Sequence, residues 1–130
     1  MDLESAKSKK MAEKKIDSPL TIEEIQLIDS TALPSIERHH LRLLAHSLAC
    51  FKLMANGDSN GPLPKEDVRL KWLLSQPAIN DNQEFIITLL EQLSCAGNQL
   101  EILADQSRIS PLELTLEELI KTILLSQRKT

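Results

Sequence analysis

Apolar side chains recur at intervals of three and four residues along most of the chain beyond residue 20. This spacing places them on one face of an α-helix, and no segment shows the pattern of a strand. Because short loops join helices that are neighbours in space, the sequence predicts an all-α fold, a compact antiparallel bundle of about five helices. Prolines and glycines interrupt the pattern, so the helices are expected over about 21–30, 35–56, 64–76, 81–104 and from 111 onward.

Capping boxes mark several helix starts. In this motif a Ser, Thr or Asp and a Glu three residues later satisfy each other's backbone N–H groups. A rival start for the last helix exists at Thr115, because segment 114–119 repeats the residue pattern of segment 20–25. Gly57 is expected to end the second helix in the left-handed conformation. Three capping pairs precede apolar stripes: Thr21 with Glu24, Asp81 with Glu84, and Ser110 with Glu113.

The predicted helices differ in where their apolar residues fall. The helix over 64–76 carries them nearly all round and is expected to be central: Val68, Leu70, Trp72, Leu73 and Leu74. The helix over 35–56 carries them on one broad face: Ile36, Leu43, Leu44, Leu48, Cys50, Phe51, Met54 and Ala55. The helix over 81–104 has a core stripe that includes Gly97, where another helix can approach closely: Phe85, Ile86, Leu89, Leu90, Leu93, Ala96, Leu100 and Leu103.

Length and composition fit one folded domain with a charged extension. A chain of 130 residues can bury an adequate core without disulfides or a structural metal. Residues 1–18 mix Lys with Asp and Glu and contain few apolar positions, so we predict a disordered charged N-terminal tail. The single helical-bundle domain is expected over residues 19–130.

The net charge of −4 argues against a nucleic-acid-binding protein, because phosphate neutralisation needs clustered Lys and Arg. The charge is uneven, since segment 81–118 contains eight acidic residues and one basic residue, and a basic partner surface would suit it. No apolar run is long enough to span a membrane, and the N-terminus lacks the apolar core of a signal peptide. We expect a cytoplasmic protein without membrane insertion, in which Cys50 and Cys95 are reduced thiols.

The loop over 56–67 has a spacing of oxygen-bearing residues that is typical of calcium-binding loops. Gly61 stands at loop position 6 and Leu63 at position 8, and the presumed ligands are Asn56, Asp58, Asn60 and Asp67. The segment therefore resembles a degenerate EF-hand loop, and the resemblance implies weak binding of Ca²⁺, the one cofactor that the sequence suggests. The departures are Asn at position 1, Asp at position 12, and two prolines. The alternative is a helix stop followed by an ordinary turn.

A basic ridge is predicted on the helix over 35–56, opposite its apolar face. Arg38, His39, Arg42 and His46 form this ridge and could bind an acidic partner or a phosphate group. The alternative is a solvated face that pairs with the protein's own acids. The histidine pairs among residues 39, 40 and 46 lack the spacing of three or four that lets one helix bind a metal.

Some apolar positions are predicted to project away from the core. Cys95 and Ile102 point to the outer side of the helix over 81–104, and Leu114 and Leu125 to the far side of the last helix. Contiguous exposed apolar surface usually marks a partner site, so a protein partner or a second copy could cover it. Another helix of the same chain would explain the pattern equally well.

The sequence contains no recognisable catalytic motif. A glycine-rich phosphate loop, an HExxH pair and a Gly-x-Ser-x-Gly turn are all missing. We therefore predict a non-enzymatic helical protein–protein interaction module, such as an adaptor, assembly factor or regulator. Its partner would be another protein, with a homodimer as a second possibility. The alternative function is a weak Ca²⁺-binding helix-loop-helix protein that uses the loop over 56–67.

Overall fold

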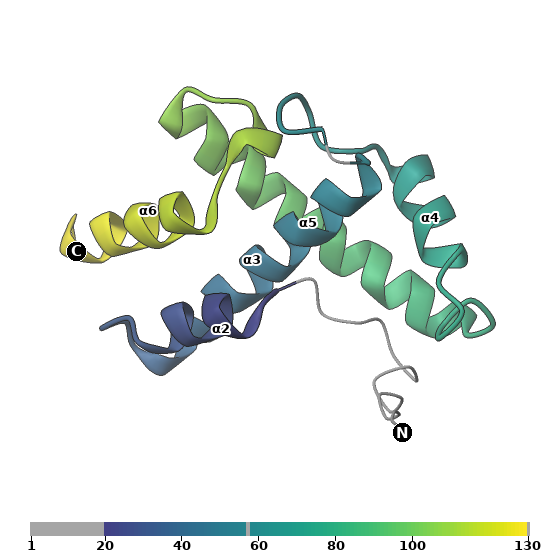
Figure 1. Cartoon of the computed structure of the whole chain (residues 1–130), viewed down its shortest axis with the longest axis horizontal. Coiled ribbons are helices and arrows are strands. Elements are labelled where there is room, and N and C mark those ends of the chain that lie inside the picture. Colours follow the sequence, from purple (N-terminus) through teal and green to yellow (C-terminus); the bar gives the residue numbers. More distant parts are fainter. Residues whose placement is uncertain (1–19, 57, 130) are drawn as a thin grey trace, which may run out of the picture.

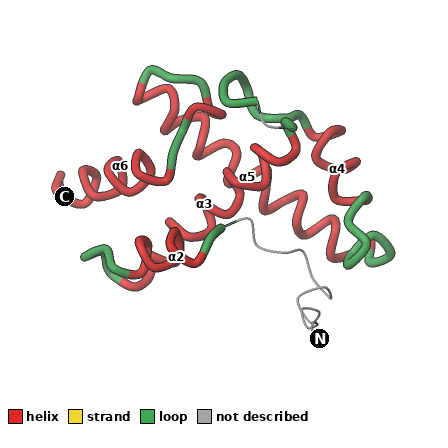
Figure 2. Tube along the Cα trace, in the orientation of Figure 1, coloured by secondary structure: helices red, strands yellow, loops and turns green. Residues whose placement is uncertain are grey.

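The computed structural model describes residues 20–56 and 58–129, with side chains as far as Leu125, and the predicted tail over 1–18 lies outside them. Five α-helices and one 3-10 turn make up this part of the chain, which contains no strand (Figure 1, Figure 2). The predicted all-α class with about five helices is confirmed. The elements are α2 (Ile22–Asp29), α3 (Ser35–Met54), α4 (Glu66–Leu74), α5 (Gln83–Ser107), η2 (Pro111–Glu113) and α6 (Leu116–Lys129).

Local side-chain chemistry sets the starts of α2 and α5. Thr21 caps α2 in the predicted box: its N–H donates to Glu24 Oε1 at 2.9 Å, and the Glu24 N–H donates to Thr21 Oγ1 at 3.1 Å. The predicted cap of α5 at Asp81 is wrong by one residue. Asn82 is the N-cap, because its side-chain oxygen accepts from the Phe85 N–H at 3.1 Å.

The segment before α6 uses two capping boxes in succession. The pair Ser110 and Glu113 caps only the 3-10 turn η2, so the prediction that a helix runs on from residue 111 is wrong. The rival start is confirmed, since Thr115 and Glu118 exchange backbone-to-side-chain hydrogen bonds of 3.2 Å each and α6 follows. Between the two, Leu114 has extended backbone and is fully buried, which corrects its predicted place on the outer surface.

Helix α3 contacts every other element of the described fold. The longest helix, α5, crosses α3, and α4 packs beside both of them (Figure 1). Helices α2 and α6 pack on α3, and both run opposite to α3, from right to left in Figure 1. The loop after α3 is held to η2, because the Gly61 N–H donates to Ser110 Oγ at 2.8 Å.

The α3–α5 crossing is closely packed around Gly97, as predicted. A Cβ built at Gly97 would lie 3.5 Å from both the Phe51 ring and Leu63, and 3.3 Å from Arg69 Nη2. The Arg69 guanidinium lies 4.8 Å from the centroid of the Phe51 ring, and its Nε donates to the Pro64 carbonyl at 2.7 Å. Phe51 itself is fully buried. The crossing is therefore the centre of the core.

Several predicted core positions are exposed instead. Ile36 is 75% exposed and Leu43 37%, whereas Leu41 and Ala45 are buried, because other helices cover α3 on more than one side and leave its first turn open. Phe85, in the first turn of α5, is also exposed. Helix α4 is not central, since it contacts only α3 and α5 extensively and its one fully buried residue is Leu73. Its exposed apolar residues are Val68, Leu70 and Leu74.

Candidate functional site

An open apolar groove of about 430 Å³ lies between α2 and α6. On the α2 side it is lined by Leu27, whose side chain is 43% exposed. On the α6 side the lining positions follow the spacing of one helical face, so the groove runs along α6. These α6 residues are Glu117, Ile120, Lys121, Leu124 and Leu125.

The groove forms because the apolar face of α6 extends beyond the residues that are buried in the core. Leu119 and Ile123 are buried on the side that packs in the core. Ile120 and Leu124 beside them are only partly buried, and Leu125 beyond them is 46% exposed. A helix of a globular protein normally turns polar residues to solvent at such positions. Exposed apolar side chains that are contiguous mark a surface suited to another protein.

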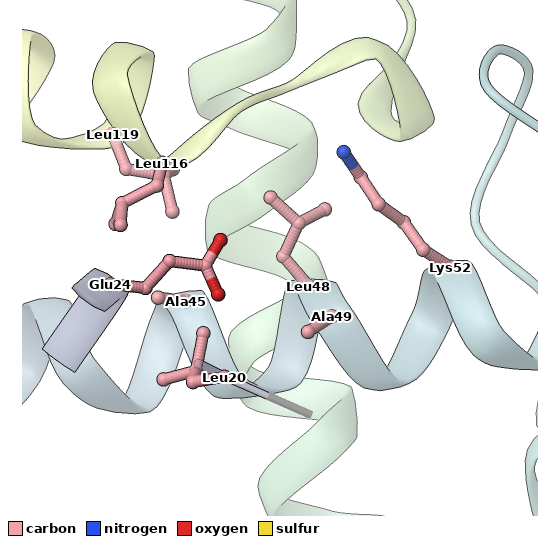
Figure 3. Close-up of a pocket in the computed structure, with 8 residues that line it drawn as sticks. All are labelled: Leu20, Glu24, Ala45, Leu48, Ala49, Lys52, Leu116 and Leu119. Atoms are coloured by element: carbon pink, nitrogen blue, oxygen red, sulfur yellow. The ribbon is translucent and has the colours of Figure 1, made fainter. Parts of the chain in front are cut away.

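A second cavity of about 80 Å³ also lies between α2 and α6, above α3 (Figure 3). Leu20 and Glu24 line it from the side of α2, and Leu116 and Leu119 line it from α6. Its floor is the surface of α3 and includes two alanines one helical turn apart, which leave room above the helix. The α3 residues are Ala45, Leu48, Ala49 and Lys52.

Two charged side chains reach into this cavity. Figure 3 shows the Glu24 carboxylate extending over α3 toward Leu48, and the Lys52 side chain extending from α3 toward the segment before α6. Lys52 Nζ donates to the Leu114 carbonyl at 2.6 Å, and Glu24 Oε1 accepts from the Thr21 N–H. Both groups therefore also stabilise the fold, because each satisfies a backbone group beside a helix start.

Carboxylates are concentrated where α2 and α6 begin, and these two ends lie close together, since Glu24 and Leu116 line the same cavity. Part of this charge is used locally, because Glu24 and Glu118 each place one oxygen in a capping box. The carboxylates of Glu23 and Glu117 make no hydrogen bond or ion pair within the described chain. The starts of α2 and α6 are therefore acidic, whereas the groove lining itself holds one acid, Glu117, and one base, Lys121.

A separate, smaller cavity of about 30 Å³ lies among α3, α4 and α5. It contains His46 and Cys50, whose Nε2 and Sγ atoms are 3.7 Å apart, and Ser47 Oγ, which is fully buried and has no hydrogen-bond partner. Burial lowers the pKa of His46 and raises the pKa of the Cys50 thiol to about 11. A thiol with so high a pKa is protonated at neutral pH and is a poor nucleophile or metal ligand. Sequence reasoning missed this pair, although its spacing of four residues could have revealed it.

The predicted basic ridge does not form one open surface. His39 and Arg42 are exposed, Arg38 is half-buried, and His46 faces the small cavity instead. Arg42 forms an ion pair with Asp29 of α2, as the alternative interpretation of this face expected. Binding of an acidic partner by this ridge stays a prediction.

The predicted outer positions on α5 do face solvent. Cys95 is exposed and Ile102 is 57% exposed. They are separate from the groove, because none of the groove's lining residues lies on α5. Both cysteines are free thiols. A partner at Cys95 and Ile102 stays a prediction.

The loop with the EF-hand-like spacing is shaped by its contacts with the fold. Gly61 has a positive φ of 108°, and its carbonyl accepts from the Leu112 N–H of η2 at 3.2 Å, while Leu63 is buried in the core. The presumed ligands Asn56, Asp58, Asn60 and Asp67 are all exposed. Asn56, with a φ of 56°, takes the left-handed conformation expected of Gly57, which itself lies outside the described residues. Ca²⁺ binding stays a prediction that nothing in this arrangement favours.

The described residues hold no cluster of three or more His, Cys, Asp or Glu side chains that could bind a metal ion. No helix among them is both long and apolar enough to cross a bilayer. The fold and groove are those of an all-helical protein with an exposed apolar surface between two helices. More particularly, the chain belongs to the family described as NDH complex assembly factor CRR9, whose model matches residues 20–129. No curated protein and no solved structure matches the chain.

Proposed function

We propose that this protein is a non-enzymatic assembly factor of the NDH complex, which acts by binding another protein through a face of its helical fold. The family match carries this proposal, because it extends over residues 20–129 and so includes all five described helices. The open groove between α2 and α6 supports it, since an apolar surface of this kind is suited to a protein partner.

The chemistry of the described residues is also consistent with a binding role. The small cavity among α3, α4 and α5 contains a histidine whose pKa is lowered and a thiol whose pKa is raised, both by burial. Neither change activates a nucleophile, which would require a lowered thiol pKa or a base oriented by a third group. A binding function needs none of these groups to react.

Loss of the protein in its native cells tests the proposal. We expect native gels to show less complete NDH complex and an accumulated smaller assembly, and we expect reintroduced wild-type protein to restore the complete complex. Tagged full-length protein should co-purify with NDH subunits identified by mass spectrometry. Normal amounts of complete NDH complex in cells that lack the protein would contradict the proposal.

A further inference from the structure

The groove between α2 and α6 is long and open enough to bind one more helix. Its lining positions on α6 run from Glu117 to Leu125, a distance of about 12 Å at the helical rise of about 1.5 Å per residue. Helices α2 and α6 run in the same direction on α3 and leave this space open between them. A helix of about three turns would span it, and helix-in-groove recognition uses anchors at i, i+3, i+4 and i+7 over such a length.

The apolar part of the groove is too small for a whole protein surface. Six residues line the groove, four of them apolar, whereas a stable interface between two folded chains uses about 20–30 residues from each. Its exposed leucines are Leu27, which lines it from α2, and Leu125, which lines it from α6. A single apolar stripe could contact both. The dimensions favour a short segment over a second folded copy of the chain.

The charge around the groove indicates which residues should lie beside the apolar stripe of the bound segment. Four carboxylates lie where α2 and α6 begin, at Glu23, Glu24, Glu117 and Glu118, and α2 has no basic residue. The basic side chains among the lining residues are Lys121 in the groove and Lys52 in the adjoining cavity. Glu23 and Glu117 have no partner within the described chain, so Lys or Arg on an incoming helix could pair with them without breaking an existing contact.

We infer that the α2–α6 groove binds a short amphipathic helix of another protein, with an apolar stripe flanked by Lys or Arg. The inference rests on the proposed function, because it specifies what kind of segment the assembly factor holds. Binding buries Leu27, Leu124 and Leu125. The flanking cations lie over the acidic first turns of α2 and α6.

Fluorescence anisotropy with the full chain tests this inference. The probe is a labelled synthetic helical peptide of five turns with a leucine stripe flanked by lysines. Two matched peptides serve as controls: one carries glutamates in place of the lysines, and the other has the same composition with its leucines scrambled. We expect saturable binding of the first peptide alone, weakened by salt because ion pairs contribute.

Variants of the protein locate the binding surface. Leu125→Lys should weaken binding of the lysine-flanked peptide by about tenfold, the scale of a central anchor. Glu117→Lys should weaken it by about threefold, the scale of an exposed ion pair. Ile87→Lys on α5 is the matched control, because it adds the same charge at a position that is 56% exposed but outside the groove. It should leave the affinity unchanged. Circular dichroism of each variant verifies that the helices are retained.

Several results would overturn the inference. These are no saturable binding, equal binding of the scrambled or glutamate peptide, or equal weakening by Ile87→Lys. A dimer in light scattering that Leu125→Lys dissociates would assign the groove to a second copy. A tenfold gain in peptide affinity on reversing the N-terminal lysines in the full chain would assign it to the protein's own first residues; these changes are Lys7→Glu, Lys9→Glu, Lys10→Glu, Lys14→Glu and Lys15→Glu.

The proposed function and the groove inference fail in distinguishable ways. Co-purification of NDH subunits that persists in the Leu125→Lys protein would overturn the groove inference and leave the assembly-factor function standing. Peptide binding that depends on the groove, together with normal NDH assembly in cells lacking the protein, would support the groove and overturn the assembly function.

Discussion

Helix α3 is packed in two different ways along its surface. Where it crosses α5, the Phe51 ring and Leu63 lie at van der Waals distance from the position of a Gly97 Cβ, so the two helices are in close contact there. Where it carries α2 and α6, those two helices leave a cavity of about 80 Å³ above α3 and an open groove beside it. One helix thus supports both close and loose packing within the described fold.

The two kinds of packing differ because α5 and α6 present different side chains to α3. At the crossing, glycine removes the side chain that would hold α5 away, and the Arg69 guanidinium lies over the Phe51 ring. On the other side, α6 brings a row of leucines and isoleucines wider than the face it packs with. Close packing stabilises the folded state, whereas unfilled apolar surface is available for binding. Substitutions at the crossing are therefore expected to lower stability most, whereas substitutions in the α2–α6 groove are expected to affect binding.

The largest effect is expected for Phe51→Ala at the crossing. The side chain is fully buried, so its loss removes apolar contacts and leaves a cavity, with a cost of about 3–5 kcal/mol. Urea unfolding followed by circular dichroism measures the change. Leu53→Ala, two residues away at a position that is 54% exposed, is the control and should alter stability by less than about 0.5 kcal/mol. Equal losses for the two variants would mean that the crossing does not dominate stability.

Gly97→Leu should have the next largest effect, because it forces a branched side chain into the crossing. A Cβ alone already lies 3.3 Å from Arg69 Nη2 and 3.5 Å from Phe51. Overpacking of this kind costs about 1–3 kcal/mol in unfolding experiments. In the control Gly97→Ala, the gain in helix propensity of about 1 kcal/mol offsets the crowding, so little net change is expected. A Gly97→Leu variant as stable as wild type would show that the helices are free to separate.

A smaller, pH-dependent effect is expected at His46, which lies on the closed side of α3. Burial lowers its pKa from 6.5, so the unfolded chain binds more protons than the folded one as the pH falls. The stability associated with neutral His46 is complete above about pH 6.5 and is lost as the pH falls below it. Thermal melts between about pH 7.5 and 5.5 measure this loss. His46→Gln should flatten the dependence. A His46→Gln protein with the same pH dependence as wild type would contradict the assignment.

Local chemistry explains how far the sequence could predict the fold. The capping boxes at Thr21 and Thr115 involve residues three positions apart, so both were visible in the sequence and both are confirmed. The outward position of Ile102 followed from helical periodicity in the same way. The exposure of Leu43 and the burial of Leu114 depend instead on how neighbouring helices extend in space, and a periodic pattern contains no such information.

The groove was beyond sequence prediction for the same reason. Leu27 and Leu125 are far apart in the sequence, and only the placement of α2 and α6 on α3 brings them together. The prediction that Leu125 projects from the core was correct. The sequence pattern gave no indication that Leu27 of α2 would line the same groove. The ion pair between Asp29 and Arg42 likewise joins two helices and removes one cation from the predicted ridge.

The smallest change in stability is expected at the groove, for Leu125→Ala. This side chain is 46% exposed, so its truncation should alter the free energy of unfolding by less than about 0.5 kcal/mol. Leu119→Ala on the same helix is the matched control, because Leu119 is fully buried and its truncation should cost about 2–5 kcal/mol. Urea unfolding measures both variants under one condition. A leucine that can be removed from α6 without loss of stability, yet whose replacement by lysine weakens binding of the peptide, has a role in recognition and not in folding. If Leu125→Ala instead costs as much as Leu119→Ala, the groove is part of the core, and the contrast between the two sides of α3 fails.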